Sequence, residues 1–324
     1  MPTRRRLLAF GAAAVASPNF FESPASAETW PARPVHFIVP LAAGGPTDSA
    51  ARLLAEQLSR IWGQQVVTDN RPGAGTNIGN EFVAHAEPDG YTALYGTASL
   101  AVNATLYHTL GYDPQTDLAP VSLVAKFPFF MFVPNSSPAR SVPEFIAYAK
   151  SKPGKLIMGS PGTGSTPHLA GELFQQMAQI KMTHAPYRGA APAFVDLIPG
   201  RIDCYFGSGE LLDASRAGQV RALATTGTSR AAAAPELPPI ADSVSGYAVD
   251  SWQGVFVPAM TAAKTIARMS EDITAALKAP AIGDTLGRWA YTAQGSSPGD
   301  LREFLKRDAE KWTAVIKNAG LSID

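Results

Sequence analysis

Apolar runs and amphipathic stretches alternate along the chain after residue 28. The run VHFIVP (35–40) ends at a proline and is followed by a pair of glycines. The segment 48–62 then repeats apolar residues at helical spacing, with Leu54, Leu58 and Ile61 on one face. The pattern continues with strand signals at 65–71 and 91–96 and a helix signal at 77–86. This alternation predicts an α/β fold.

Two similar strand endings divide the chain. KFPFFMFVP begins near residue 126 and SWQGVFVP near residue 251, and both close on Phe-Val-Pro. A second series of strand and helix signals lies between them. We predict two lobes joined by two crossings, with 28–127 plus 252–324 in lobe one and 128–251 in lobe two. The alternative is two unrelated strands that happen to end at prolines.

The last forty residues contain the best-defined helix signal. Apolar side chains share one face of the segment after Pro298, Ser297 is a candidate N-cap, and Gly320 stands where a helix would end. The stretch 295–299 also matches the G-x-S-x-G nucleophile elbow, but the last histidine in the chain is His184, and that fold places its histidine after the serine. The helix cap is therefore the favoured interpretation.

Composition limits the classes of function. The 324 residues carry 27 basic and 27 acidic side chains, so no basic excess suits a nucleic acid or an anionic membrane surface. The single cysteine, Cys204, excludes an intramolecular disulfide. The five histidines form no metal-binding motif. We expect no metal, no cofactor and no nucleic-acid partner. No local nucleophile–base motif is present, but this does not exclude an enzyme, because catalytic triads are often scattered along a sequence.

The first 27 residues predict export. A basic start, MPTRRR, precedes the short apolar stretch 7–16, and a small-x-small site ends at Ala27. Two adjacent arginines also fit a twin-arginine signal, and the general secretory route remains open beside it. We predict a signal peptide cleaved near Ala27 and a mature protein in the periplasm, because an exported fold without disulfides is more typical of that compartment than of a small secreted scaffold. No later run is long and apolar enough to span a membrane.

Two strand–loop–helix units carry the candidate chemistry. One is VHFIVP followed by LAAGGPTD, and the other is KLIMGS followed by PGTGST and a helix. The second resembles a phosphate loop, except that Ser165 stands where the lysine belongs. Free N–H groups at a helix start favour an anion, and without lysine or arginine a carboxylate suits these loops better than a triphosphate. Ordinary strand–helix turns are the alternative.

The chain resembles the substrate-binding proteins of tripartite tricarboxylate transporters, the Bug family of extracytoplasmic solute receptors. The likeness runs along nearly all of the mature chain, in the order and spacing of its segments. They are VPLAAGGPTD (39–48), DNRPGAGTNIGNEFVAHAEPDGYT (69–92), LGYDPQTDLAPVSLV (110–124), GSPGTGSTPHLAGELF (159–174), HAPYRGAAPAFVDLIPGRID (184–203) and VRALATTG (220–227).

The resemblance implies a two-lobed, type II-like periplasmic-binding fold that closes on a small carboxylate and delivers it to membrane permease subunits. It implies a monomer without catalytic activity. Carried over by position, the resemblance gives a set of ligand-binding candidates. These are Leu41, Gly44, Gly45, Thr47, Asp48, Thr76, Asn77, Ser160, Thr163, Ser165, Thr166, His168, Tyr187, Arg188, Gly189 and Asp203.

Several alternatives stay open at this point. Asp48 is either a ligand contact or a helix-start residue, His168 lies either in the site or on the outer face of its helix, and Arg188 is either a carboxylate clamp or an ion-pair strut. Leu41 replaces the family's usual aromatic residue, and GSGELLDASRAG (207–218) replaces an Asp/Asn-containing stretch. The carboxylate therefore stays unnamed. A sensor-kinase partner and a periplasmic α/β hydrolase are the remaining functional alternatives.

Overall fold

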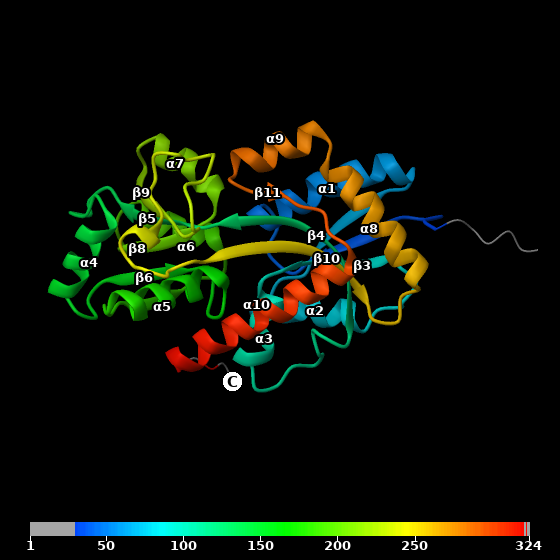
Figure 1. The fold of residues 1–324 in the computed structure, drawn as a ribbon, viewed down its shortest axis with the longest axis horizontal. Helices are drawn as coiled ribbons and strands as arrows, with labels where there is room; N and C mark the ends of the chain where they lie inside the picture. The colour runs from blue at the N-terminus through cyan, green and yellow to red at the C-terminus, as the bar shows by residue number, and fades with distance from the viewer. Residues whose placement is uncertain (1–29, 321, 323–324) are drawn as a thin grey trace, which may run out of the picture.

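The computed structural model describes residues 30–320 and residue 322, so the predicted signal peptide lies outside the described residues. Two separate β-sheets, each covered by helices, lie side by side (Figure 1). The long strands β4 and β10 run between them, and the C-terminal helix α10 extends from one sheet toward the other. The α/β fold class predicted from the alternating pattern is confirmed.

The first sheet has six strands in the order β11-β4-β10-β3-β1-β2. β1 pairs in parallel with both β2 and β3, whereas β10 is antiparallel to β3 and β4. The strands span β1 Val35–Val39, β2 Val66–Asn70, β3 Thr92–Thr97, β4 Leu118–Pro128, β10 Asp250–Pro258 and β11 Thr292–Ala293.

The second sheet has five strands in the order β7-β6-β8-β5-β9. β6 is parallel to β7 and to β8, and β5 is antiparallel to β8 and β9. The strands span β5 Phe130–Pro134, β6 Ile157–Ser160, β7 Thr183–Pro186, β8 Cys204–Gly207 and β9 Val220–Thr225.

Most helices follow a strand directly. The helix predicted at 48–62 begins two residues earlier, because Gly45 is its N-cap and Pro46 occupies a first-turn position that needs no donor. The α-helices are α1 Pro46–Trp62, α2 Asn77–Ala84, α3 Ser99–Leu106, α4 Val142–Ser151, α5 Thr166–Ala178, α6 Ala190–Leu197, α7 Leu212–Arg216, α8 Ala263–Leu277, α9 Pro280–Arg288 and α10 Pro298–Ala319. Short 3₁₀ turns are η1 Ala74–Thr76, η2 Gly209–Leu211 and η3 Ile240–Asp242.

Apolar burial follows the predicted faces with one exception. Leu54, Leu58 and Trp62 of α1 are buried, but Ile61 is 39% exposed, so its assignment to the buried face was wrong. At the C-terminus the predicted caps are confirmed, since Ser297 accepts a hydrogen bond from the Asp300 N–H and Gly320 is left-handed. Within the described residues, no helix is both long and apolar enough to cross a membrane.

The strand registers place the carboxyl ends of both parallel sets at the junction between the sheets. Gln253, near the start of β10, pairs with Thr97 at the end of β3. Phe130, at the start of β5, pairs with Gly207 at the end of β8. Because β4 leads into β5 and β10 returns from the second sheet, both carboxyl edges lie where the chain crosses from one sheet to the other.

Candidate functional site

Six connections meet at this junction. In the first sheet α1, η1 and α3 begin after β1, β2 and β3, and in the second sheet α5, α6 and η2 begin after β6, β7 and β8. In open α/β sheets, ligands bind outside the carboxyl ends of parallel strands, where helix N-termini point. The candidate site is therefore built from these six connections.

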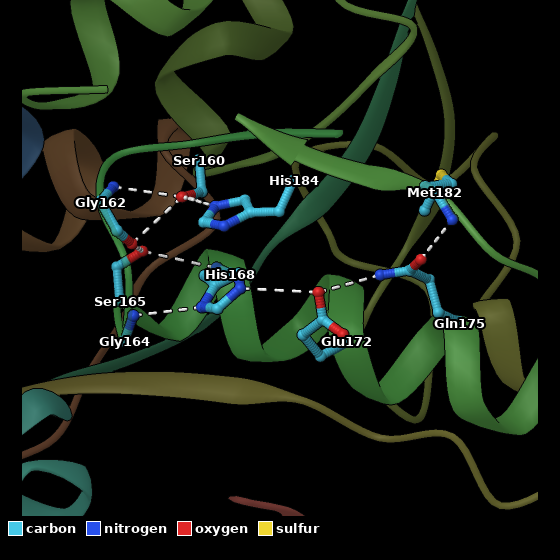
Figure 2. A network of polar contacts seen from close by, with 9 residues as sticks. All are labelled: Ser160, Gly162, Gly164, Ser165, His168, Glu172, Gln175, Met182 and His184. Carbon is cyan, nitrogen blue, oxygen red and sulfur yellow. Dashed lines mark hydrogen bonds and ion pairs between the residues drawn. The ribbon is translucent and has the colours of Figure 1, made fainter. Parts of the chain in front are cut away.

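The β6–α5 loop, residues 160–166, is held by its own side chains (Figure 2). Ser160 is fully buried, and its hydroxyl lies 3.2 Å from the Gly162 nitrogen and 2.7 Å from Nε2 of His184. Ser165 is the N-cap of α5, accepts from the His168 N–H, and donates from its hydroxyl to the Gly162 carbonyl at 2.7 Å. These bonds fix the loop without a charged group.

Two stacked imidazoles lie under this loop. The rings of His168 and His184 are 3.8 Å apart at an angle of 21°. Nδ1 of His168 accepts from the Gly164 N–H at 3.1 Å, so the proton of a neutral His168 ring is on Nε2, which faces Glu172 at 3.5 Å. Burial, together with the neighbouring His168 ring, lowers the pKa of His184 to about 4. His184 is therefore neutral at pH 7.

Two N–H groups of the β6–α5 loop are left for a ligand. The N–H groups of Gly162, Gly164 and Ser165 bond to Ser160, His168 and the Gly162 carbonyl. Within the described chain, those of Thr163 and Thr166 have no partner. Thr166 opens helix α5, so its N–H points along the positive end of the helix dipole.

The β1–α1 loop, residues 41–48, is held by a charged group instead. Asp48 is 3% exposed, and its Oδ2 accepts from the Gly44 N–H at 2.9 Å and from Nε of Arg52 at 3.0 Å. Burial acts to raise the pKa of Asp48, but these hydrogen bonds outweigh it and hold the pKa below the usual 3.8. Gly44 has φ 78°, which favours glycine, whereas Gly45 has an ordinary φ of −84°.

This loop also presents free donors. Within the described part of the chain, the N–H groups of Gly45, Thr47 and Asp48 have no hydrogen-bond partner. The Leu41 carbonyl accepts from the Asn70 amide at 3.0 Å, which fixes the loop start. Both glycine-rich loops therefore combine an internally tethered backbone with unpaired N–H groups at a helix start, as an anion site requires.

The turn before α2 is conformationally strained. Four successive residues, 73–76, have positive φ, and two of them, Ala74 (46°) and Thr76 (83°), are not glycine. Such backbone persists only where its surroundings over-determine it, often at ligand clamps. Thr76 pairs with Ser99 at 2.7 Å, and Oδ1 of Asn77 accepts from Asn103 at 2.6 Å. The side chains of Thr76 and Asn77 thus belong to a buried polar network.

Four further candidates follow β7 or precede β8. The Tyr187 N–H donates to the Ser160 carbonyl and that of Gly189 to the Pro161 carbonyl, so the segment 187–189 lies beside the β6–α5 loop. Arg188 is exposed and, among the described residues, has no ion-pair partner, so the ion-pair strut, one of its two alternatives, is not formed. Asp203 accepts from the Ile157 N–H at the opposite end of β6 and is not brought to the loop.

The serine of the elbow-like motif has a structural role. Ser297, the serine of the elbow-like motif, caps α10 and pairs with Asp300. The short Ser160–His184 contact involves a serine with no exposed surface. Among the described residues, no cluster of three or more histidine, cysteine or acidic side chains could hold a metal ion.

Sequence reasoning missed the residues that support the loops from a distance. Arg52 and Asn70 brace the β1–α1 loop, and the buried Gln253 donates to Thr47 at 3.3 Å while accepting from Tyr95 at 2.8 Å. No local motif marks these side chains. A polar residue inside an otherwise apolar strand, such as Gln253 in DSWQGVFVP, was the one available signal.

Comparison with known proteins gives a consistent picture. Residues 50–321 match the model of the tripartite tricarboxylate transporter family receptor. A protein from the tcbD–tcbE intergenic region of Pseudomonas sp. (strain P51) is 35% identical over 89% of this chain and 87% of its own. BugT of Bordetella pertussis is 33% identical over 93% of this chain and 94% of its own.

Solved structures agree with the fold. Rpa4515 of R. palustris, solved with adipate, has a TM-score of 0.87 and 36% identity, and the match covers 90% of this chain and 99% of that one. MatC of Rhodopseudomonas palustris, solved with malate, has a TM-score of 0.82 and 28% identity over 89% and 100% of the two chains. The predicted two-lobed periplasmic-binding fold is confirmed. The residue limits of the lobes stay a prediction.

Proposed function

Because this chain belongs to the tripartite tricarboxylate transporter receptor family, we propose that it is a periplasmic receptor for a small organic carboxylate. The acid is bound between the two lobes, with the β1–α1 loop on one side and the β6–α5 loop on the other. The observation that carries the proposal is the pair of tethered loops whose N–H groups at Thr47, Asp48, Thr163 and Thr166 have no partner in the described chain.

Charge favours a carboxylate over a phosphate ester. Neither loop contains lysine or arginine, so the negative charges of a phosphate ester would remain uncompensated. Hydrogen bonds to one carboxylate contribute about 1.5–3 kcal/mol each. Four or five of them offset the cost of ordering a small acid and leave about micromolar affinity. Adipate and malate, bound to the similar proteins Rpa4515 and MatC, are both carboxylates.

The proposal also covers the export of the protein, its oligomeric state and the delivery of its ligand. The signal peptide is removed near Ala27, the mature chain works as a monomer, and it passes its ligand to membrane permease subunits. A pull-down from membranes in the presence of ligand tests the partner, because recovery of a sensor kinase instead of a permease contradicts this delivery.

A thermal-shift panel tests the binding function. Mono-, di- and tricarboxylates, including adipate and malate, are added to the mature protein at concentrations from micromolar to millimolar. At least one acid is expected to raise the melting temperature, because a ligand at 100 times its Kd stabilises the folded state by about 2.7 kcal/mol. No shift across the panel, together with no retained ligand in native mass spectrometry, contradicts the proposal.

A further inference from the structure

Helix α2 begins directly against the start of the β1–α1 loop. A Cβ atom added to Gly79, in the first turn of the helix, would lie 2.8 Å from Cβ of Pro40 and 3.0 Å from the Arg71 carbonyl oxygen, so a glycine is needed for this approach. The Arg71 N–H donates to the Val39 carbonyl at 2.8 Å, at the end of β1. Asn77, which opens α2, is therefore a neighbour of the loop whose unpaired N–H groups form one side of the candidate site.

Asn77 carries a side-chain donor that no other described residue uses. The residue is only 7% exposed, and its Oδ1 accepts from Nδ2 of Asn103 at 2.6 Å and from the Tyr112 hydroxyl at 2.9 Å. Its Nδ2 has no hydrogen-bond partner in the described chain, yet this atom is not sealed from solvent. Because buried polar groups are normally paired, the two N–H bonds of this amide are left for a group from outside the fold.

The backbone sets the direction of these hydrogen bonds. Nδ2 of Asn103 also donates to the Gly75 carbonyl at 3.0 Å, and a carbonyl can only accept. The Asn103 amide therefore has one orientation, and the Asn77 atom that faces it is the acceptor, Oδ1. The Tyr112 hydroxyl accepts from Nδ2 of Asn80 at 2.9 Å, which leaves its own proton for the same Oδ1. Both contacts turn the N–H bonds of Asn77 toward the accessible side.

We propose that Asn103 and Tyr112 are positioning residues, which orient the Asn77 amide so that it donates to a carboxylate oxygen of the bound acid. Asn103 is 1% exposed and Tyr112 is 5% exposed, so they act through Asn77 and not on the acid itself. The proposal rests on the carboxylate-receptor function and adds a side-chain donor beside the backbone N–H groups. An uncharged donor agrees with loops that contain neither lysine nor arginine.

A double-mutant cycle on Kd tests the positioning role. Calorimetry uses whichever of adipate, malate, succinate and citrate binds the wild-type mature protein most tightly. Asn77→Ala is expected to weaken binding by about tenfold or more, because a hydrogen bond to a charged group is lost. Tyr112→Phe keeps the ring but removes one anchor of the amide, and a loss of about threefold or more is expected. In the Asn77→Ala background the same change should cost less than about 1.5-fold, because no amide remains to be oriented.

Tyr91→Phe is the matched control. Tyr91 precedes the amino end of β3, at the end of the sheet away from the junction, and its hydroxyl accepts from the Ala32 N–H at 2.9 Å. This variant also loses one tyrosine hydrogen bond, but its Kd should stay within about 1.5-fold of the wild-type value. The melting temperature of every variant reports folding separately from binding.

Asn103→Ala gives a second route to the same answer, because it removes the other anchor of the Asn77 amide. Its loss of affinity should also shrink when Asn77 is already alanine. If Tyr112→Phe does not fold, this second cycle decides by the same criterion.

The outcomes distinguish the positioning role from the receptor function. Losses that multiply in the double variants overturn the positioning role, because Tyr112 and Asn103 would then act without Asn77. Full affinity in Asn77→Ala overturns the assignment alone and leaves the receptor function standing. A wild-type protein that binds none of the acids overturns the receptor function, and the assignment with it.

Discussion

The β1–α1 and β6–α5 loops have the same outline and different internal supports. In the β1–α1 loop a buried carboxylate, Asp48, holds the Gly44 N–H and is itself held by Arg52. In the β6–α5 loop hydroxyl and imidazole groups hold the backbone instead, with Ser165 as the N-cap and Nδ1 of His168 accepting from the Gly164 N–H. One loop depends on a buried carboxylate, and the other on hydroxyl and imidazole groups.

Because of this difference, the contributions of the two loops to stability change in different pH ranges. The depressed pKa of Asp48 means that its contribution to stability is present above pH 3.8 and is lost only as the pH falls through its lower folded-state value. The depressed pKa of His184 acts in the same direction, but in a higher pH range. Between pH 6.5 and about 4 the unfolded chain takes up a proton that the folded chain refuses, so stability falls as the pH falls.

Removing the charge of the β1–α1 loop is expected to have the largest effect on stability. Asp48→Ala deletes the acceptor of two hydrogen bonds, and we expect the free energy of unfolding to fall by about 2 kcal/mol, equally at pH 7 and pH 5. Urea denaturation at both pH values measures it. Asp48→Asn, which keeps an acceptor for Gly44 but not the charge, is the matched control and should lose less. A loss below about 0.5 kcal/mol in Asp48→Ala shows that the tether is not stabilising.

Acidification is expected to act through His184 to a smaller extent. From pH 7 to pH 5 its contribution to the free energy of unfolding should fall by about 1–2 kcal/mol. His184→Gln removes the titrating group. The slope of the free energy of unfolding against pH reports the protons taken up on unfolding, and that number should fall by up to one. If wild-type protein and His184→Gln give parallel pH profiles in urea denaturation, the neutral imidazole has no energetic role.

The cap of α5 is expected to have the smallest effect of the three. Ser165→Ala should cost about 1 kcal/mol of stability and weaken binding of the acid, because it frees the loop. Ser141→Ala is a close control, since Ser141 caps α4 at the same 3.4 Å distance and is also followed by a first-turn proline. It should cost similar stability without changing Kd. Equal changes in Kd for both variants contradict a local role for Ser165.

The sequence predicted the positions of helices and strands better than the roles of individual side chains. Strands such as VHFIVP and the amphipathic C-terminal helix depend on local periodicity and caps, so their positions followed within about two residues. Ile61 was misplaced because helical spacing alone does not say how wide a buried stripe is.

The loops were predicted as units, but most of their named side chains turned out to be internal supports. Asp48, Ser165 and His168 hold backbone groups, which leaves neighbouring N–H groups unpaired. Which atoms stay unpaired depends on geometry that composition does not contain. The close approach of Gly209 to the backbone of Trp289 depends on how two distant segments pack, and no local pattern encodes it.

The central claim is that backbone N–H groups bind the acid, and one substitution pair tests it directly. Thr166→Pro deletes the unpaired N–H at a helix position that tolerates proline, and Ser165 already has the extended backbone that a following proline needs. Thr166→Ala deletes only the side chain. Calorimetry with an acid that the thermal-shift panel identifies should show a loss of about tenfold or more for Thr166→Pro and less than about threefold for Thr166→Ala. Full affinity in a folded Thr166→Pro variant, or an equal loss in both, contradicts the claim.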